Sequence, residues 1–86
     1  DLDPARARAL AGGGTVFESL EALVASEAEA VIISTPPDTH EAIAAAALQA
    51  GKHVIVEKPM ASSVAACARM IALARARGRV LTVGFN

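Results

Sequence analysis

Three short segments hold the side chains best suited to binding a polar ligand, and each directly follows an apolar run. They are Thr35-Pro36-Pro37-Asp38-Thr39-His40, Glu57-Lys58-Pro59 and Gly84-Phe85-Asn86. In open α/β sheets, ligands bind beyond the carboxyl ends of the strands. If the apolar runs are strands of one parallel sheet, all three segments lie together at its ligand-binding edge.

The apolar runs themselves resemble buried strands. They cover residues 30–34, 53–56 and 80–83, and they are continuous instead of alternating, which is typical of parallel strands. Pro36, Pro37 and Pro59 end the first two runs, because proline cannot continue a central hydrogen-bonded ladder.

Four helices are expected around these strands, over residues 4–11, 19–24, 38–50 and 62–77. The expected N-caps are Asp3, Ser19, Asp38 and Ser62. Asp38 and Glu41 have the spacing of a capping box, and Gly51 suits a left-handed helix end. In the third helix we expect Ile43, Ala44, Ala47 and Leu48 to be buried. In the fourth, the spacing predicts an apolar face formed by Val64, Cys67, Ala68, Ile71 and Ala72.

Alternation of strands and helices with short loops implies right-handed crossovers and a parallel sheet. The expected fold is therefore α/β, a partial Rossmann-type doubly wound sheet. No repeat, linker or low-complexity tract divides residues 1–86, so no internal domain boundary is expected. A helix follows Asp1 directly and Asn86 follows a strand directly. The sequence is therefore expected to be a fragment of a larger fold.

Composition excludes several classes of function. The net charge of −1 and pI of about 6.1, with scattered basic residues, argue against nucleic-acid binding. No apolar run approaches the length of a membrane span. The single Cys67 excludes an internal disulfide and is expected to fill core space. Gly12-Gly13-Gly14 follows a helix, whereas a phosphate-binding loop follows a strand.

The order of the motifs resembles the Gfo/Idh/MocA family, which includes glucose–fructose oxidoreductase and inositol dehydrogenase. Residues 51–59, GKHVIVEKP, match its "GKHVxxEKP" signature, and residues 35–40, TPPDTH, match its "TPxxxH" segment. Residues 1–7, 19–23 and 83–86 (DLDPARA, SLEAL and VGFN) are similar to further family segments in the same order. The resemblance extends over essentially the whole chain.

The resemblance implies a role for each matching position. Lys58 would be the catalytic lysine, where an ammonium donor could polarise a carbonyl group. Glu57 would bind the nicotinamide ribose, and Asp1 the adenosine ribose, which slightly favours NAD over NADP. The other residues expected at the cofactor are Thr35, Pro36, Pro37, His40, Pro59 and Asn86. No metal ligand is implied, and whether the Lys58-Pro59 bond is cis stays open at this point.

Each of these residues also has a structural explanation. Lys58 and Glu57 could be an exposed pair worth about 0–1 kcal/mol. The 35–37 segment could serve only to end a strand, and Asp1 could be a second capping acid beside Asp3. A histidine in a first helical turn is more often a local hydrogen-bonding residue, so His40 is not expected to be the general base.

The family's first strand with its glycine-rich turn and its C-terminal α/β domain do not occur in these residues. The resemblance implies a parent NAD- or NADP-dependent oxidoreductase that transfers hydride between nicotinamide and a sugar, cyclitol or similar polyol. The parent is expected to be a cytoplasmic homo-oligomer, and this chain alone is expected to be inactive. The alternative is a non-catalytic nucleotide- or ligand-binding remnant. A receiver-type signalling domain fits less well, because Ser34, Thr35 and Glu57 provide no acidic cluster.

Overall fold

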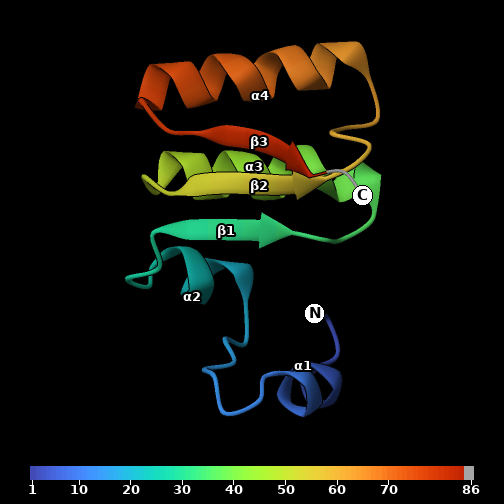
Figure 1. Cartoon of the computed structure of the whole chain (residues 1–86), viewed down its shortest axis with the longest axis vertical. Coiled ribbons are helices and arrows are strands. Elements are labelled where there is room, and N and C mark those ends of the chain that lie inside the picture. The colour runs from blue at the N-terminus through green and yellow to red at the C-terminus, as the bar shows by residue number, and fades with distance from the viewer. Residues whose placement is uncertain (85–86) are drawn as a thin grey trace.

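Three parallel strands form the centre of the structure (Figure 1), with β1 at Ala30–Ile33, β2 at His53–Glu57 and β3 at Leu81–Gly84. The strand order is β1-β2-β3. The register pairs Ile33 with Val56, and Glu57 with Gly84, so the carboxyl ends lie at one edge as predicted. The computed structural model describes residues 1–84. The predicted site residue Asn86 lies outside the described residues.

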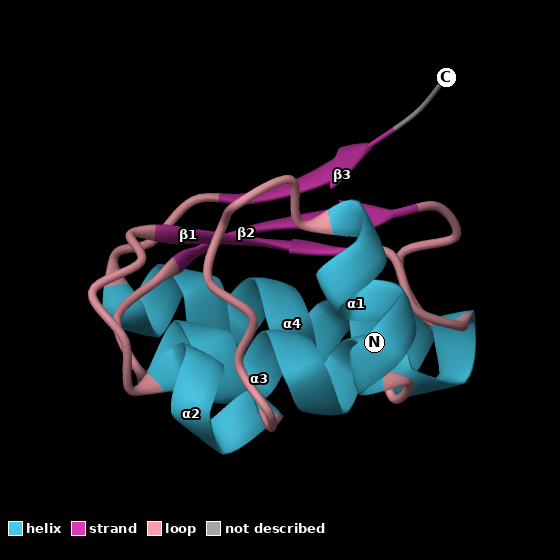
Figure 2. Cartoon of the chain, turned by 90° about the horizontal axis from the view of Figure 1, so that it is seen from below, coloured by secondary structure: helices cyan, strands magenta, loops and turns pink. Residues whose placement is uncertain are grey.

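Helices α3 (His40–Gln49) and α4 (Val64–Arg77) connect these strands and lie on the same face of the sheet (Figure 2). Sequential parallel strands joined by right-handed crossovers require this arrangement. The side chains of β1 and β2 that point toward the helices are at most 5% exposed. On the opposite face, Ile32 and Ile55 are 70% and 39% exposed. The described elements therefore form one covered face of the expected parallel α/β sheet.

The core lies between this face and the two helices. In α3, Ala44, Ala47 and Leu48 are fully buried, as predicted, and Ile43 is partly buried. Small alanine side chains let α3 approach both the sheet and α4 closely, while Leu48 supplies larger buried area.

The predicted apolar face of α4 is wrong. Val64 is 86% exposed and Ile71 is 41% exposed, whereas the buried residues are Ala66, Met70 and Ala74. Alanines occur all around this helix, so apolar spacing alone does not single out one face. Close packing against α3 selects the face in which alanines flank one long methionine.

Two predicted helix caps are also wrong. Ser63, not Ser62, has the extended backbone of an N-cap, and its hydroxyl accepts a hydrogen bond from Ala66 N at 3.1 Å. Asp38 lies within the short 3-10 helix η1 (Pro37–Thr39) that precedes α3. The fixed φ of Pro37 starts helical geometry one residue before Asp38, so Asp38 cannot adopt the extended cap conformation.

The N-terminal segment packs less tightly than the rest. Helix α1 (Pro4–Leu10) begins at the predicted cap Asp3, and α2 (Leu20–Val24) begins at the predicted cap Ser19. Neither helix contains a fully buried residue. Leu23 and Val24 nevertheless contact the core. Among residues 1–84, no helix is long and apolar enough to cross a membrane.

Candidate functional site

The end of β2 presents a carboxylate and an ammonium group side by side in the sequence, and both side chains are exposed. Glu57 is the last residue of β2, and Lys58 follows it. The Glu57 carboxylate lies over Gly84 of the neighbouring strand, where an added Cβ would be 3.7 Å from Glu57 Oε1. The Lys58-Pro59 peptide bond, which the sequence left open, is cis.

A hydroxyl network orders the loop after β1. Thr39 N and Thr39 Oγ1 both donate to Pro36 O, at 2.9 and 2.6 Å. Thr39 Oγ1 also lies 2.6 Å from Thr35 Oγ1. Because the Thr39 hydroxyl proton is used on Pro36, Thr35 is the donor of the pair. Sequence reasoning missed Thr39, whose position directly before a helix was the available signal.

His40 lies beneath this loop, at the start of α3, and is only 1% exposed. Its Nε2 is 2.7 Å from Thr35 O, and its Nδ1 is 3.0 Å from Pro59 O and 3.3 Å from Met60 O. The ring therefore lies between the two loops that carry the predicted cofactor residues. Direct contact of His40 with a cofactor stays a prediction, and the burial of the ring argues against it.

Asp1 lies in a different part of this edge. Its Oδ1 accepts a hydrogen bond from Asp3 N at 2.8 Å. Asp1 and Thr35 both line a groove of about 470 Å³ between the N-terminal segment and β1. Neither Glu57 nor Lys58 contributes to that groove. The structure thus places Asp1 and Thr35 on one groove, and Glu57 and Lys58 at the end of the adjacent strand β2.

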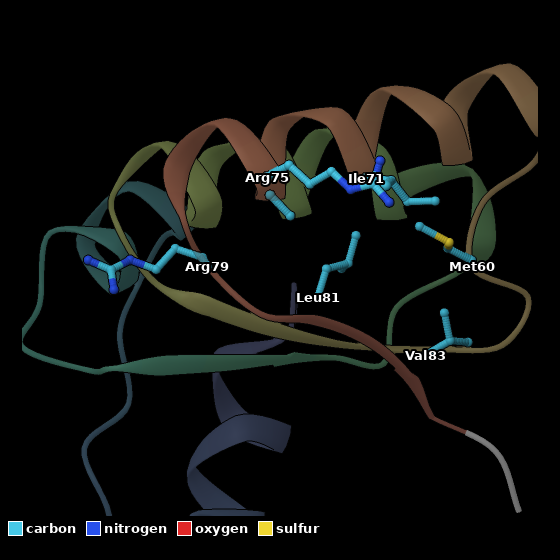
Figure 3. A pocket seen from close by; sticks show the side chains of 7 residues that line it. Met60, Ile71, Arg75, Arg79, Leu81 and Val83 are labelled. Carbon is cyan, nitrogen blue, oxygen red and sulfur yellow. The ribbon is translucent and has the colours of Figure 1, made fainter.

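A smaller groove of about 300 Å³ lies between α4 and the edge strand β3 (Figure 3). Met60 and Val83 lie at its end near the strand carboxyl ends, and Arg79 lies at the other end. None of the predicted site residues lines it. This groove therefore runs between α4 and β3 and is separate from the predicted cofactor edge.

The other deeply buried polar residue that the structure describes is Lys52, which is 5% exposed at the start of β2. Its Nζ donates to Ser26 O at 2.9 Å and to Ala28 O at 2.7 Å. These carbonyl groups belong to the loop between α2 and β1, at the edge opposite Lys58. No pattern in the sequence predicted this contact, because the two partners are backbone atoms.

One ion pair links the outer surfaces of the two core helices. Arg69 of α4 donates to Glu41 of α3 from Nε at 2.5 Å and from Nη2 at 3.0 Å. The hydrogen bond from Arg69 lowers the pKa of the Glu41 carboxyl below its ordinary value; desolvation opposes this shift, and the positive charge of Arg69 adds to it. The side chains of Arg69 and Glu41 are 63% and 35% exposed, so the pair stabilises the fold only weakly.

Comparison with known proteins agrees with this architecture. Residues 1–85 match a family model described as an oxidoreductase family with an NAD-binding Rossmann fold. Inositol 2-dehydrogenase 1 of Saccharopolyspora erythraea is 40% identical over an alignment 86 residues long. The alignment covers 94% of this chain and 26% of the relative. The chain thus spans about a quarter of the length of that relative.

Solved structures show the same fold. The WlbA dehydrogenase from Bordetella pertussis in complex with NADH and UDP-GlcNAcA is 33% identical with a TM-score of 0.91, covering 98% of this chain and 25% of that one. A 3-ketoreductase from Actinomadura kijaniata in complex with TDP-benzene and NADP is 33% identical with a TM-score of 0.93, covering 99% of this chain and 28% of that one. These neighbours contain NADH in one case and NADP in the other.

Proposed function

Because the chain belongs to the Gfo/Idh/MocA oxidoreductase family, we propose that it supplies the nicotinamide-facing part of an NAD- or NADP-dependent dehydrogenase. The reaction is hydride transfer between the cofactor and a sugar, cyclitol or similar polyol. The observation that supports this most directly is the exposed Glu57-Lys58 pair at the carboxyl end of β2, beside the loop after β1.

The residues at this edge fit the chemistry of a dinucleotide. Carboxylates accept hydrogen bonds from neighbouring hydroxyl groups, so Glu57 and Asp1 suit the two ribose rings. When bound, the nicotinamide supplies the hydride chemistry, and the protein orients it. Thr35, Pro36 and Pro37 would line its path. NAD is slightly favoured over NADP because Asp1 would oppose a 2′-phosphate.

Lys58 is assigned the catalytic role in this proposal. Its Nζ donates a hydrogen bond to the reacting oxygen of the substrate and stabilises the negative charge that develops there during carbonyl reduction. In the opposite direction, the same ammonium group binds the substrate hydroxyl and orients it. Residues 1–86 alone are proposed to be inactive, because the elements described in residues 1–84 leave Lys58 exposed to solvent.

The test uses the full-length natural protein. Binding of NAD and NADP is measured calorimetrically, and a panel of sugars and cyclitols is screened for reduction of the cofactor. Lys58→Met, which keeps the chain length but removes the ammonium group, is expected to lower kcat by about 10²–10⁴-fold while cofactor binding persists. Absence of cofactor binding in the wild type would favour the ligand-binding remnant, and an unchanged kcat in Lys58→Met would refute the catalytic role.

A further inference from the structure

Among residues 1–84, the groups that face the ring nitrogens of His40 are all hydrogen-bond acceptors. The polar atoms within hydrogen-bonding distance of its ring nitrogens are the carbonyl oxygens of Thr35, Pro59 and Met60. Carbonyl oxygens only accept hydrogen bonds, so each bond requires a proton on the ring. Either neutral tautomer donates to one loop, and the imidazolium donates to both. In every protonation state, the ring bonds at least one loop and fills the space between the two.

These carbonyl groups belong to residues that border the predicted site. Thr35 immediately precedes Pro36, and Pro59 immediately follows Lys58. The pyrrolidine ring already fixes φ of Pro59. A hydrogen bond to Pro59 O therefore restrains ψ, the remaining soft dihedral of that residue. The loop that carries Lys58 is thus restrained from beneath by a side chain that is 1% exposed.

We propose that His40 is a positioning residue: it holds the Thr35 loop and the Lys58 loop at a fixed separation and acts through them without touching cofactor or substrate. The proposal rests on the proposed function, because it assigns the Lys58 loop to catalysis. Its basis is the joint contact of one buried ring with both loops, 2.7 Å from Thr35 O and 3.0 Å from Pro59 O. Nδ1 faces the Lys58 loop and Nε2 faces the Thr35 loop. The nitrogen that carries the proton donates to its loop, and the ring packs against the other loop.

Three substitutions in the full-length natural protein separate the contacts of the two nitrogens. His40→Phe keeps an aromatic ring and removes both ring nitrogens. His40→Asn places an amide near the position of Nδ1, and His40→Gln places one near the position of Nε2. Removing one hydrogen bond corresponds to roughly 0.5–1.5 kcal/mol, or a change of about 2–10-fold in a rate or affinity.

We expect His40→Phe to lower kcat and raise the KM for NAD or NADP, each by about 2–10-fold. His40→Asn is expected to recover kcat more than KM, and His40→Gln to recover KM more than kcat. The matched control is Lys52→Met, which removes a buried donor to backbone carbonyls at the opposite edge and is expected to leave kcat and KM unchanged. Rates are normalised to folded protein by titration of cofactor sites.

Amide hydrogen exchange provides a readout independent of activity. In His40→Phe, residues 34–39 and 57–61 are expected to exchange faster, whereas residues 26–29 stay unchanged. Unchanged exchange in both loops overturns the proposal, and so does a kcat and KM equal to those of the wild type. If the loops loosen but the wild-type protein binds no nicotinamide cofactor, the proposed function fails while the contact between the loops stands.

Discussion

The amino ends of the three strands lie along one edge of the sheet, the amino edge, and their carboxyl ends lie along the opposite one, the carboxyl edge. At both edges a buried side chain contacts backbone carbonyl groups, but the loops that carry these carbonyl groups differ. At the amino edge, buried Lys52 donates to two backbone carbonyl groups of the loop at residues 26–28. At the carboxyl edge, the ring of buried His40 lies against backbone carbonyl groups of two loops. None of residues 26–28 was predicted to belong to the site, whereas the His40 loops carry Thr35 and Lys58.

This difference shows that burial of a polar side chain does not reveal its function. A buried donor with carbonyl partners satisfies groups that would otherwise be costly to bury, and this is true at both edges. What separates the two is the identity of the residues next to the bonded carbonyl groups. The amino edge should therefore influence stability alone, and the carboxyl edge both stability and turnover.

The largest expected stability effect tests the amino edge. Lys52→Met removes the donor to Ser26 O and Ala28 O while the unbranched side chain fills similar space. We expect the free energy of unfolding of the full-length protein to fall by about 1–3 kcal/mol, because both carbonyl groups lose a charged donor. Denaturant titration measures this loss, and steady-state kinetics measure turnover per folded molecule. A fall in kcat equal to that of His40→Phe would remove the distinction between the edges.

The sequence predicted the carboxyl edge better than the packing around it. Strand and loop positions follow from apolar runs that end at prolines, so the placement of Thr35 and Glu57 at the same edge was predictable. Family resemblance then assigned the roles, which remain predictions. The register of the parallel strands places the ends of β2 and β3 next to each other, since it aligns Glu57 with Gly84.

Most partners of Lys52 and His40 were not predictable, because they are backbone carbonyl groups 19 to 26 residues away in sequence. Sequence patterns identify side-chain types, whereas every residue offers the same carbonyl oxygen. The prediction of the buried face of α4 failed for a related reason. Its many alanines make several faces equally apolar, and contact with α3 decides which one is buried.

A smaller effect is expected at the start of α4, which lies near the carboxyl edge but bonds neither site loop. Ser63→Ala removes the hydrogen bond from Ala66 N to the cap hydroxyl and should cost about 1 kcal/mol of stability. Ser62→Ala is the matched control and should stay within about 0.5 kcal/mol. Thermal and denaturant unfolding measure both. If Ser62→Ala proved the more destabilising, the helix would begin one residue earlier, and its buried face would have to rotate.

The smallest effect concerns Glu41, the neighbour of His40 on the solvent side of α3. The hydrogen bond from Arg69, helped by its charge, lowers the pKa of the Glu41 carboxyl in the folded protein. A depressed folded pKa stabilises the protein above the unfolded pKa, and this contribution is lost as pH falls through the folded pKa. In Arg69→Met, the Glu41 pKa should rise toward its ordinary value, measured by carbon NMR of the carboxyl group, and Arg77→Met should leave it unchanged. Because the pair is exposed and contacts neither loop, kcat should not follow this titration. A kcat that did follow it would mean that the outer surface of α3 also positions His40, and the carboxyl edge would then extend beyond the buried ring.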